Sequence, residues 1–140
     1  MKRTPLKRTE FKRKTTPSPK QYRPKPKPKA IKAYWTLVAS LGCIVTRRTE
    51  GVTIHHVHGG SMRGILERGR GMKQDWFVLP LHAELHTAGA TGIDTGFGVD
   101  AWEKMYGTQW NYLMEVMRRT GVDPFEMSGL PWPEGVDRPI

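Results

Sequence analysis

The first 32 residues combine lysine, arginine and proline in a way that excludes them from a packed core. They hold 13 of the chain's 23 lysines and arginines but only one acid, Glu10. The stretch RPKPKPK, residues 23–29, alternates proline with basic residues. Proline removes backbone donors and favours an extended polyproline II chain, and the like charges repel one another. We therefore expect a basic arm over residues 1–30 and one folded domain over residues 31–140.

The partner that we expect for this arm is nucleic acid. Cationic side chains displace counterions from phosphates, which gives an affinity that is independent of base sequence and sensitive to salt. A solubilising tail and an import signal are the alternatives. The arm residues that we expect to bind phosphates are Lys2, Arg3, Lys7, Arg8, Lys12, Arg13 and Lys14.

The sequence lacks long apolar runs and contains a single cysteine. The sequence has no apolar core of a secretory signal and no run of about 18 apolar residues, so we expect no membrane partner and a cytoplasmic location. The single cysteine, Cys43, excludes an internal disulfide and any zinc site that needs two thiolates of this chain. The candidate metal ligands are therefore the five histidines, which all fall between residues 55 and 86.

Short segments before the histidines predict a helix and a hairpin. Residues 31–42, IKAYWTLVASLG, have the composition of a helix that ends at a glycine. Two β-rich runs, 43–46 (CIVT) and 52–57 (VTIHHV), flank a turn that ends in glycine. We expect these two runs to pair with each other, and the glycine- and arginine-rich residues 59–74 to form a loop.

The second half of the chain predicts helices, which makes the expected fold class α+β. Residues 81–88, LHAELHTA, would form a helix with Pro80 at its first turn and Gly89 at its end. The segments 99–107 and 108–121 have apolar residues at helical spacing and predict two amphipathic helices.

The histidines fall into two groups that could meet around one metal ion. His82 and His86 are four residues apart and would share a face of the predicted helix. His55 and His56 are adjacent on a predicted strand, so their side chains point to opposite faces. One of the two would face the metal and the other a different part of the site. We expect His58, at the end of the strand, to be solvated.

The acid near the helical pair does not match that of a zinc protease. In the H-E-x-x-H motif the glutamate follows the first histidine directly. Here Glu84 lies two residues after His82, about 200° around a helix, so it would point away from the metal.

Three stretches resemble a known family of nucleases. IHHVHGG (54–60), DWFVLPLHAELH (75–86) and WEKMYGTQ (102–109) are similar to the HNH, or ββα-metal, endonucleases, and most of all to phage recombination-enhancement (Ref-type) nucleases. The likeness covers roughly residues 41–117. It implies a small ββα-metal core with flanking helices and a metal-dependent DNA endonuclease that uses one divalent ion, Mg²⁺, Mn²⁺ or Zn²⁺. It also implies single- or double-stranded DNA as substrate, RecA-coated DNA as a partner, and the host cytoplasm as the location of a phage-encoded protein.

Site roles follow from the resemblance position by position. It implies that His55 is a metal ligand, His56 the general base and His86 a second ligand on the helix, with Asp75 orienting the base. Relatives often hold a separate structural zinc, but Thr46 stands where a second cysteine would be.

The remaining ligands of the catalytic metal are open. His82 occupies the position of a helix cysteine in relatives and could join the catalytic metal. Relatives often place another histidine shortly after the helix, whereas this chain has Asp94 there. The ligand set is therefore either His55, His82 and His86 with water, which we prefer, or the same set completed by Asp94.

The chemistry expected of such a site is phosphodiester hydrolysis. A divalent ion stabilises charge that develops on phosphate, and a neutral imidazole with a pKa near 6.5 can activate water. The alternative is a non-catalytic nucleic-acid-binding module that a structural zinc stabilises. Arginines that could clamp the flanking phosphates, or simply form a solvated face, are Arg47, Arg48, Arg63, Arg68 and Arg70.

Overall fold

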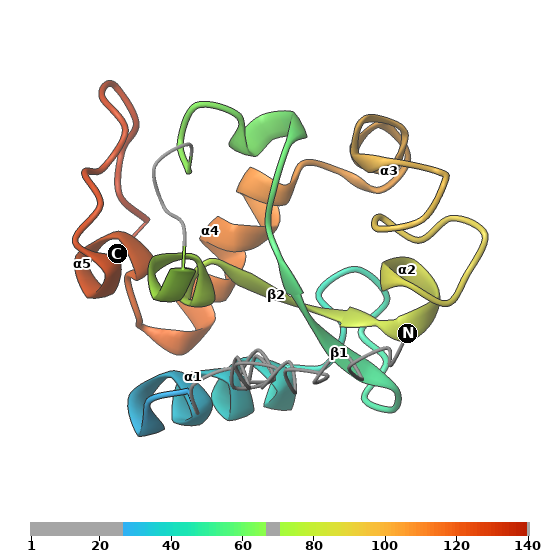
Figure 1. Cartoon of the computed structure of the whole chain (residues 1–140), viewed down its shortest axis with the longest axis horizontal. Coiled ribbons are helices and arrows are strands. Elements are labelled where there is room, and N and C mark those ends of the chain that lie inside the picture. Colours follow the sequence, from blue (N-terminus) through green and yellow to red (C-terminus); the bar gives the residue numbers. More distant parts are fainter. Residues whose placement is uncertain (1–26, 67–70, 140) are drawn as a thin grey trace, which may run out of the picture.

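A computed structural model describes residues 27–66 and 71–139 of the chain (Figure 1). It has a mixed α+β fold, in which several helices surround one two-stranded antiparallel sheet. The elements, in chain order, are α1 (Lys29–Ser40), β1 (Val52–His56), the 3₁₀ turns η1 (Gly60–Met62) and η2 (Gly71–Trp76), β2 (Val78–His82), α2 (Ala83–His86), α3 (Val99–Tyr106), α4 (Gln109–Thr120) and α5 (Pro124–Ser128).

The sheet pairs β1 with β2, not with residues 43–46 as the sequence predicted. The register sets Val52 opposite His82 and His56 opposite Val78. Residues 43–46 form a turn instead, which Arg47 closes in the left-handed region at φ 66°. The backbone N–H of Ile44 then donates to Pro80 O at 2.9 Å. Cys43 and Ile44 are therefore buried beside β2, and the run 43–46 does not form a hairpin with β1.

The predicted helix over residues 81–88 is also wrong at its start. All five residues of β2 are buried, so their pattern shows neither strand alternation nor a helical period. Pro80 lies within this strand, where proline is tolerated because both strands of a two-stranded sheet are edge strands. The helix α2 begins only at Ala83 and ends at His86.

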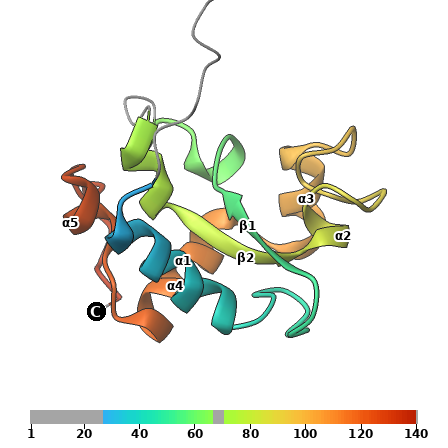
Figure 2. The same ribbon diagram turned by 60° about the horizontal axis from the view of Figure 1, so that its bottom comes forward.

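Helices α1 and α4 lie against the sheet and enclose the core with it (Figure 2). Apolar side chains from α1, β2 and α4 are buried together, and Trp102 of α3 belongs to the same core. The predicted helices in the segments 31–42, 99–107 and 108–121 correspond to α1, α3 and α4. One helix was not predicted: α5 lies in the Pro- and Gly-rich end of the chain and buries Phe125.

Glu103 of α3 connects the turn after β1 to the start of α4. Its carboxylate accepts from the backbone N–H of Ser61 at 2.7 Å and from that of Gln109 at 2.7 Å. Gly60 makes this possible, because a Cβ there would lie 1.9 Å from Glu103 Oε1 and the φ of Gly60 is +47°. The end of β1 is thus fastened to the N-terminus of α4.

No helix in the described parts of the chain, residues 27–66 and 71–139, has the length and hydrophobicity to cross a membrane.

Candidate metal centre

The alternation of strand β1 separates two adjacent histidines, as the sequence predicted. The side chain of His55 is wholly buried on the side of α2 and α4, whereas that of His56 is 42% exposed on the other face. Successive side chains of a strand point to opposite faces, so β1 sets the two imidazoles on opposite sides of the sheet.

A tight loop after α2 brings Asp94 back to His86. The backbone N–H of Asp94 donates to His86 O at 3.0 Å, and that of Ile93 donates to Leu85 O at 2.9 Å. Gly92 allows the close approach, because a Cβ there would lie 2.7 Å from His86 O. These contacts place the carboxylate of Asp94 beside the ring of His86.

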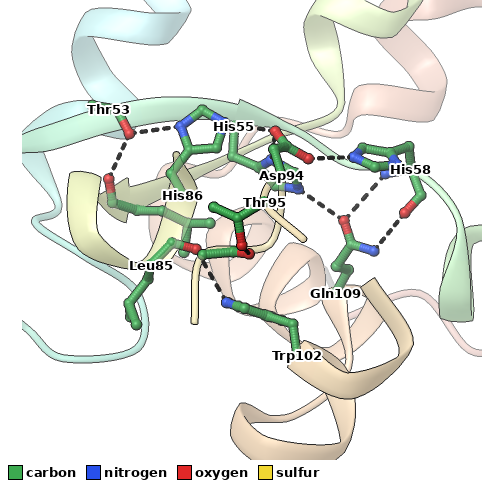
Figure 3. Close-up of polar contacts among 11 residues, drawn as sticks. Thr53, His55, His58, Leu85, His86, Asp94, Thr95, Trp102 and Gln109 are labelled. Carbon is green, nitrogen blue, oxygen red and sulfur yellow. Dashed lines mark hydrogen bonds and ion pairs between the residues drawn. The ribbon is translucent and has the colours of Figure 1, made fainter. Parts of the chain in front are cut away.

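His55, His86 and Asp94 form a cluster whose donor atoms converge (Figure 3). One donor atom of each lies within 4.8 Å of the other two. Asp94 Oδ2 is 3.3 Å from His55 Nδ1 and 2.9 Å from His86 Nε2. We call these three residues the His–His–Asp cluster. Three of the predicted ligands therefore meet, although they come from a strand, a helix and a loop.

The proton positions on His86 follow from its neighbour Thr53. The hydroxyl of Thr53 donates its one proton to Leu81 O at 2.8 Å, so it must accept from His86 Nδ1–H, also at 2.8 Å. In the neutral ring the lone pair is then on Nε2, which faces Asp94. Burial and the nearby His55 lower the pKa of His86, which favours this neutral form.

The electrostatics of the cluster suit a cation. His55 Nδ1 is buried and has no hydrogen-bond partner among the described residues. Asp94 Oδ1 accepts from His58 Nε2 at 2.6 Å, and Asp94 Oδ2 faces both His55 and His86. Two imidazole nitrogens and a carboxylate oxygen are donors that Zn²⁺ and other divalent transition metals accept. The residues present therefore fit a metal ion.

His82 is not part of the His–His–Asp cluster, which corrects the preferred three-histidine set. It is the last residue of β2 and the N-cap of α2, where its Nδ1 accepts from the backbone N–H of Glu84 at 3.2 Å. Its Nε2 lies against Gly51, at which a Cβ would be only 2.8 Å away. Since β2 extends to His82, this residue and His86 do not share a helix face.

His56 forms a dyad with Asp75, as the resemblance implied. His56 Nε2 is 2.8 Å from Asp75 Oδ1, and Asp75 is 3% exposed. Lys27 Nζ binds the other carboxylate oxygen at 2.7 Å. The indole N–H of Trp35 donates to the backbone oxygen of Asp75, and the Trp35 ring meets the ring of His56 edge-on at 5.4 Å. With Nε2–H donated to Asp75, His56 Nδ1 is the nitrogen that can take up a proton.

Two residues of the site were missed by the sequence reasoning. His58, expected to be solvated, is half exposed but binds Asp94 Oδ1 through its Nε2 at 2.6 Å. Gln109 is fully buried and contacts both His55 and the backbone of His58. A polar residue directly after the N-cap Thr108 was the one available signal for Gln109, and it does not distinguish a site residue from a solvated one.

A cleft of about 510 Å³ lies beside His56 of the dyad. Its walls include both His56 and His58, the latter bonded to Asp94. The cleft is open and has both polar and apolar walls, formed by His56, Val57, His58, Gly59, Met62, Arg63, Gly64, Leu66 and Gln74.

Among the predicted phosphate-binding arginines that the structure describes, Arg63 is the one that lines the cleft. It is well exposed and pairs weakly with Asp100 at 3.5 Å. Arg47 instead pairs with Glu115, and Arg48 with Glu50. The remaining predicted contacts lie outside the described residues: Arg68, Arg70, Lys2, Arg3, Lys7, Arg8, Lys12, Arg13 and Lys14.

One of three comparisons with known proteins identifies a family. Neither the curated proteins nor the solved structures give a match to this chain. The sequence model of the family described as "Protein of unknown function (DUF968)" matches residues 13–121. This match covers more than half of the chain, and the protein therefore belongs to the DUF968 family.

Proposed function

We propose that this protein is a metal-dependent DNA endonuclease of the HNH (ββα-metal) type. The observation that carries the proposal is the His–His–Asp cluster, in which the buried His55 Nδ1 has no hydrogen-bond partner among the described residues and faces Asp94. The order β1, β2, α2, with one histidine of the cluster on β1 and the other on α2, also agrees with a ββα-metal core.

The His56–Asp75 dyad supplies the base of the proposed reaction. His56 Nδ1 takes a proton from the water that attacks phosphorus, and Asp75 stabilises the resulting imidazolium through its bond to Nε2–H. Lys27 and Trp35 hold Asp75 in place. A divalent ion bound to the cluster would stabilise the charge that develops on the phosphate and on the leaving oxygen.

The dyad favours catalysis over a purely structural metal site. A structural zinc site is completed by four protein ligands and does not require a second histidine–carboxylate pair nearby. Here His56 is on the opposite face of β1, is partly exposed, and opens onto the cleft. A buried carboxylate that orients an accessible imidazole is typical of a general base.

The charge distribution favours a nucleic acid over a small phosphodiester. The chain has a formal net charge of +10, and its basic excess comes from the first 32 residues. Such a segment attracts the many phosphates of a polymer. Arg63 on the cleft wall would pair with a phosphate next to the scissile one.

Cleavage assays with the full chain test this function. The protein is stripped with a chelator and incubated with plasmid DNA and with single-stranded DNA, each bare and coated with RecA, in the presence of Mg²⁺, Mn²⁺ or Zn²⁺. We expect strand cleavage with at least one ion and none with excess chelator. A protein that binds metal and DNA but cleaves none of these substrates would be the non-catalytic module instead.

Removal of the arm should weaken DNA binding without removing the site. The truncation should begin at Lys27, because that residue binds Asp75 and α1 starts at Lys29. We expect the chain of residues 27–140 to bind DNA less tightly and with a smaller salt dependence. The slope of log K against log salt is negative, and each lost phosphate contact reduces its magnitude by about 0.9. Affinities measured at several salt concentrations check this, and equal slopes for both chains would contradict it.

A further inference from the structure

Gln109 contacts the ring nitrogen of His55 that does not face Asp94. Its Oε1 lies 2.9 Å from His55 Nε2, and His55 Nδ1 lies 3.3 Å from Asp94 Oδ2. Both side chains of this pair are fully buried, so water does not replace the contact. Gln109 and Asp94 therefore determine which ring nitrogen of His55 carries a proton.

The backbone of His58 fixes which end of the Gln109 amide faces His55. The amide nitrogen donates to His58 O at 2.7 Å, and Oε1 accepts from the backbone N–H of His58 at 3.1 Å. If the amide were rotated by 180°, its NH₂ group would face the backbone N–H of His58 and its oxygen would face His58 O. Neither hydrogen bond could then form. The group that faces His55 Nε2 is therefore an oxygen, which only accepts.

We propose that Gln109 is a positioning residue that holds neutral His55 with its proton on Nε2 and its lone pair on Nδ1. The inference rests on the proposed metal site, since the lone pair would then be directed toward the ion. It explains why a buried Nδ1 has no hydrogen-bond partner among the described residues.

The role of Gln109 parallels that of Thr53 on the other histidine. Thr53 leaves the lone pair of His86 on Nε2, and Gln109 leaves that of His55 on Nδ1, so both lone pairs face Asp94. Outer hydrogen bonds of this kind set the tautomer of ligating histidines, and their loss costs about 10–100-fold in metal affinity.

Two substitutions separate positioning from folding. Gln109→Met keeps the length of the side chain but removes its hydrogen bonds, and we expect metal affinity to fall by about 10–100-fold. Gln109→Glu loses the donor to His58 O but keeps an acceptor for His55 Nε2–H, and we expect it to retain the wild-type tautomer of His55. Gln74→Met makes the same chemical change in the cleft wall, away from His55, and should keep the wild-type affinity for metal.

The tautomer itself is measured by ¹⁵N correlation spectra of the histidine rings in the metal-free full chain at pH 8. We expect His55 to be protonated on Nε2 in the wild type and in Gln109→Glu, and to show a mixture or Nδ1–H in Gln109→Met. Affinities for Zn²⁺ and Mn²⁺ are measured by titration calorimetry on the same proteins.

Each result decides the proposal. Unchanged protonation of His55 in Gln109→Met overturns it, even if metal affinity falls. If Gln109→Met does not fold, Gln109→Glu decides: Nε2–H supports the proposal and Nδ1–H overturns it. If the wild type binds no metal, the proposed nuclease function fails, whereas the spectra of the metal-free protein still decide the role of Gln109.

Discussion

Replacement of His56 by alanine is expected to reduce the rate of DNA cleavage by about 10²–10⁴-fold, the usual contribution of a general base. The metal content should stay at the wild-type level, because His56 points away from the His–His–Asp cluster on the other face of β1. Single-turnover cleavage rates, together with metal analysis of the same protein, check both parts of this expectation.

His56→Gln provides the matched control for the loss of a hydrogen bond. The amide of glutamine reaches the position of His56 Nε2 and can still donate to Asp75, so the buried carboxylate keeps a partner, but it cannot accept a proton from water. We expect the glutamine variant to be as slow as the alanine variant. Wild-type rates in either variant would show that another group activates the water, while loss of metal would show that His56 belongs to the metal site.

The second large effect is expected from His86→Ala compared with His82→Ala. His86 is one of three donors in the cluster, so its loss should cost more than the roughly 10–100-fold that removal of an outer-shell partner costs. His82 lies outside the cluster, and its loss should leave metal affinity unchanged. Calorimetric titration with Zn²⁺ and Mn²⁺ measures both affinities.

His82→Ala has its own expected effect, on stability. His82 is the N-cap of α2, and the loss of a side-chain cap costs about 0.5–2 kcal/mol of unfolding free energy. Urea unfolding of both variants therefore shows whether each is folded when metal is added. A strong loss of metal affinity in folded His82→Ala, with none in His86→Ala, would contradict the site described above.

The helices were predictable because their patterns are local. The segments that became α1, α3 and α4 carry apolar residues at helical spacing over eight or more residues. The strand partner was not predictable in this way, since β1 pairs with β2 across a loop that contains η1 and η2. Residues 43–46 are equally apolar and closer in sequence, so pattern alone favoured the wrong partner.

The same limit explains which parts of the site were predicted. His55 and His56 could be assigned to opposite faces because strand geometry alone decides this. His82 was wrongly predicted to lie in a helix. A proline such as Pro80 is also common in the first turn of a helix, and the fully buried β2 lacks the alternation that identifies a strand. His58 and Gln109 enter the site only through contacts with distant segments, at Asp94 and at the end of β1, and no local pattern encodes these.

The salt bridge between Lys27 and Asp75 has a consequence for how substrate would reach the base. Residue 26 is bonded directly to Lys27, which contacts Asp75, so the basic segment joins the folded part of the chain beside the His56–Asp75 dyad. A polymer captured anywhere along that segment becomes an intramolecular neighbour of His56, at an effective concentration set by a tether of at most about 3.5 Å per residue. Binding of the polymer to the basic segment would then raise the concentration of phosphodiesters near His56, even though the bound phosphates are not the ones that are cleaved.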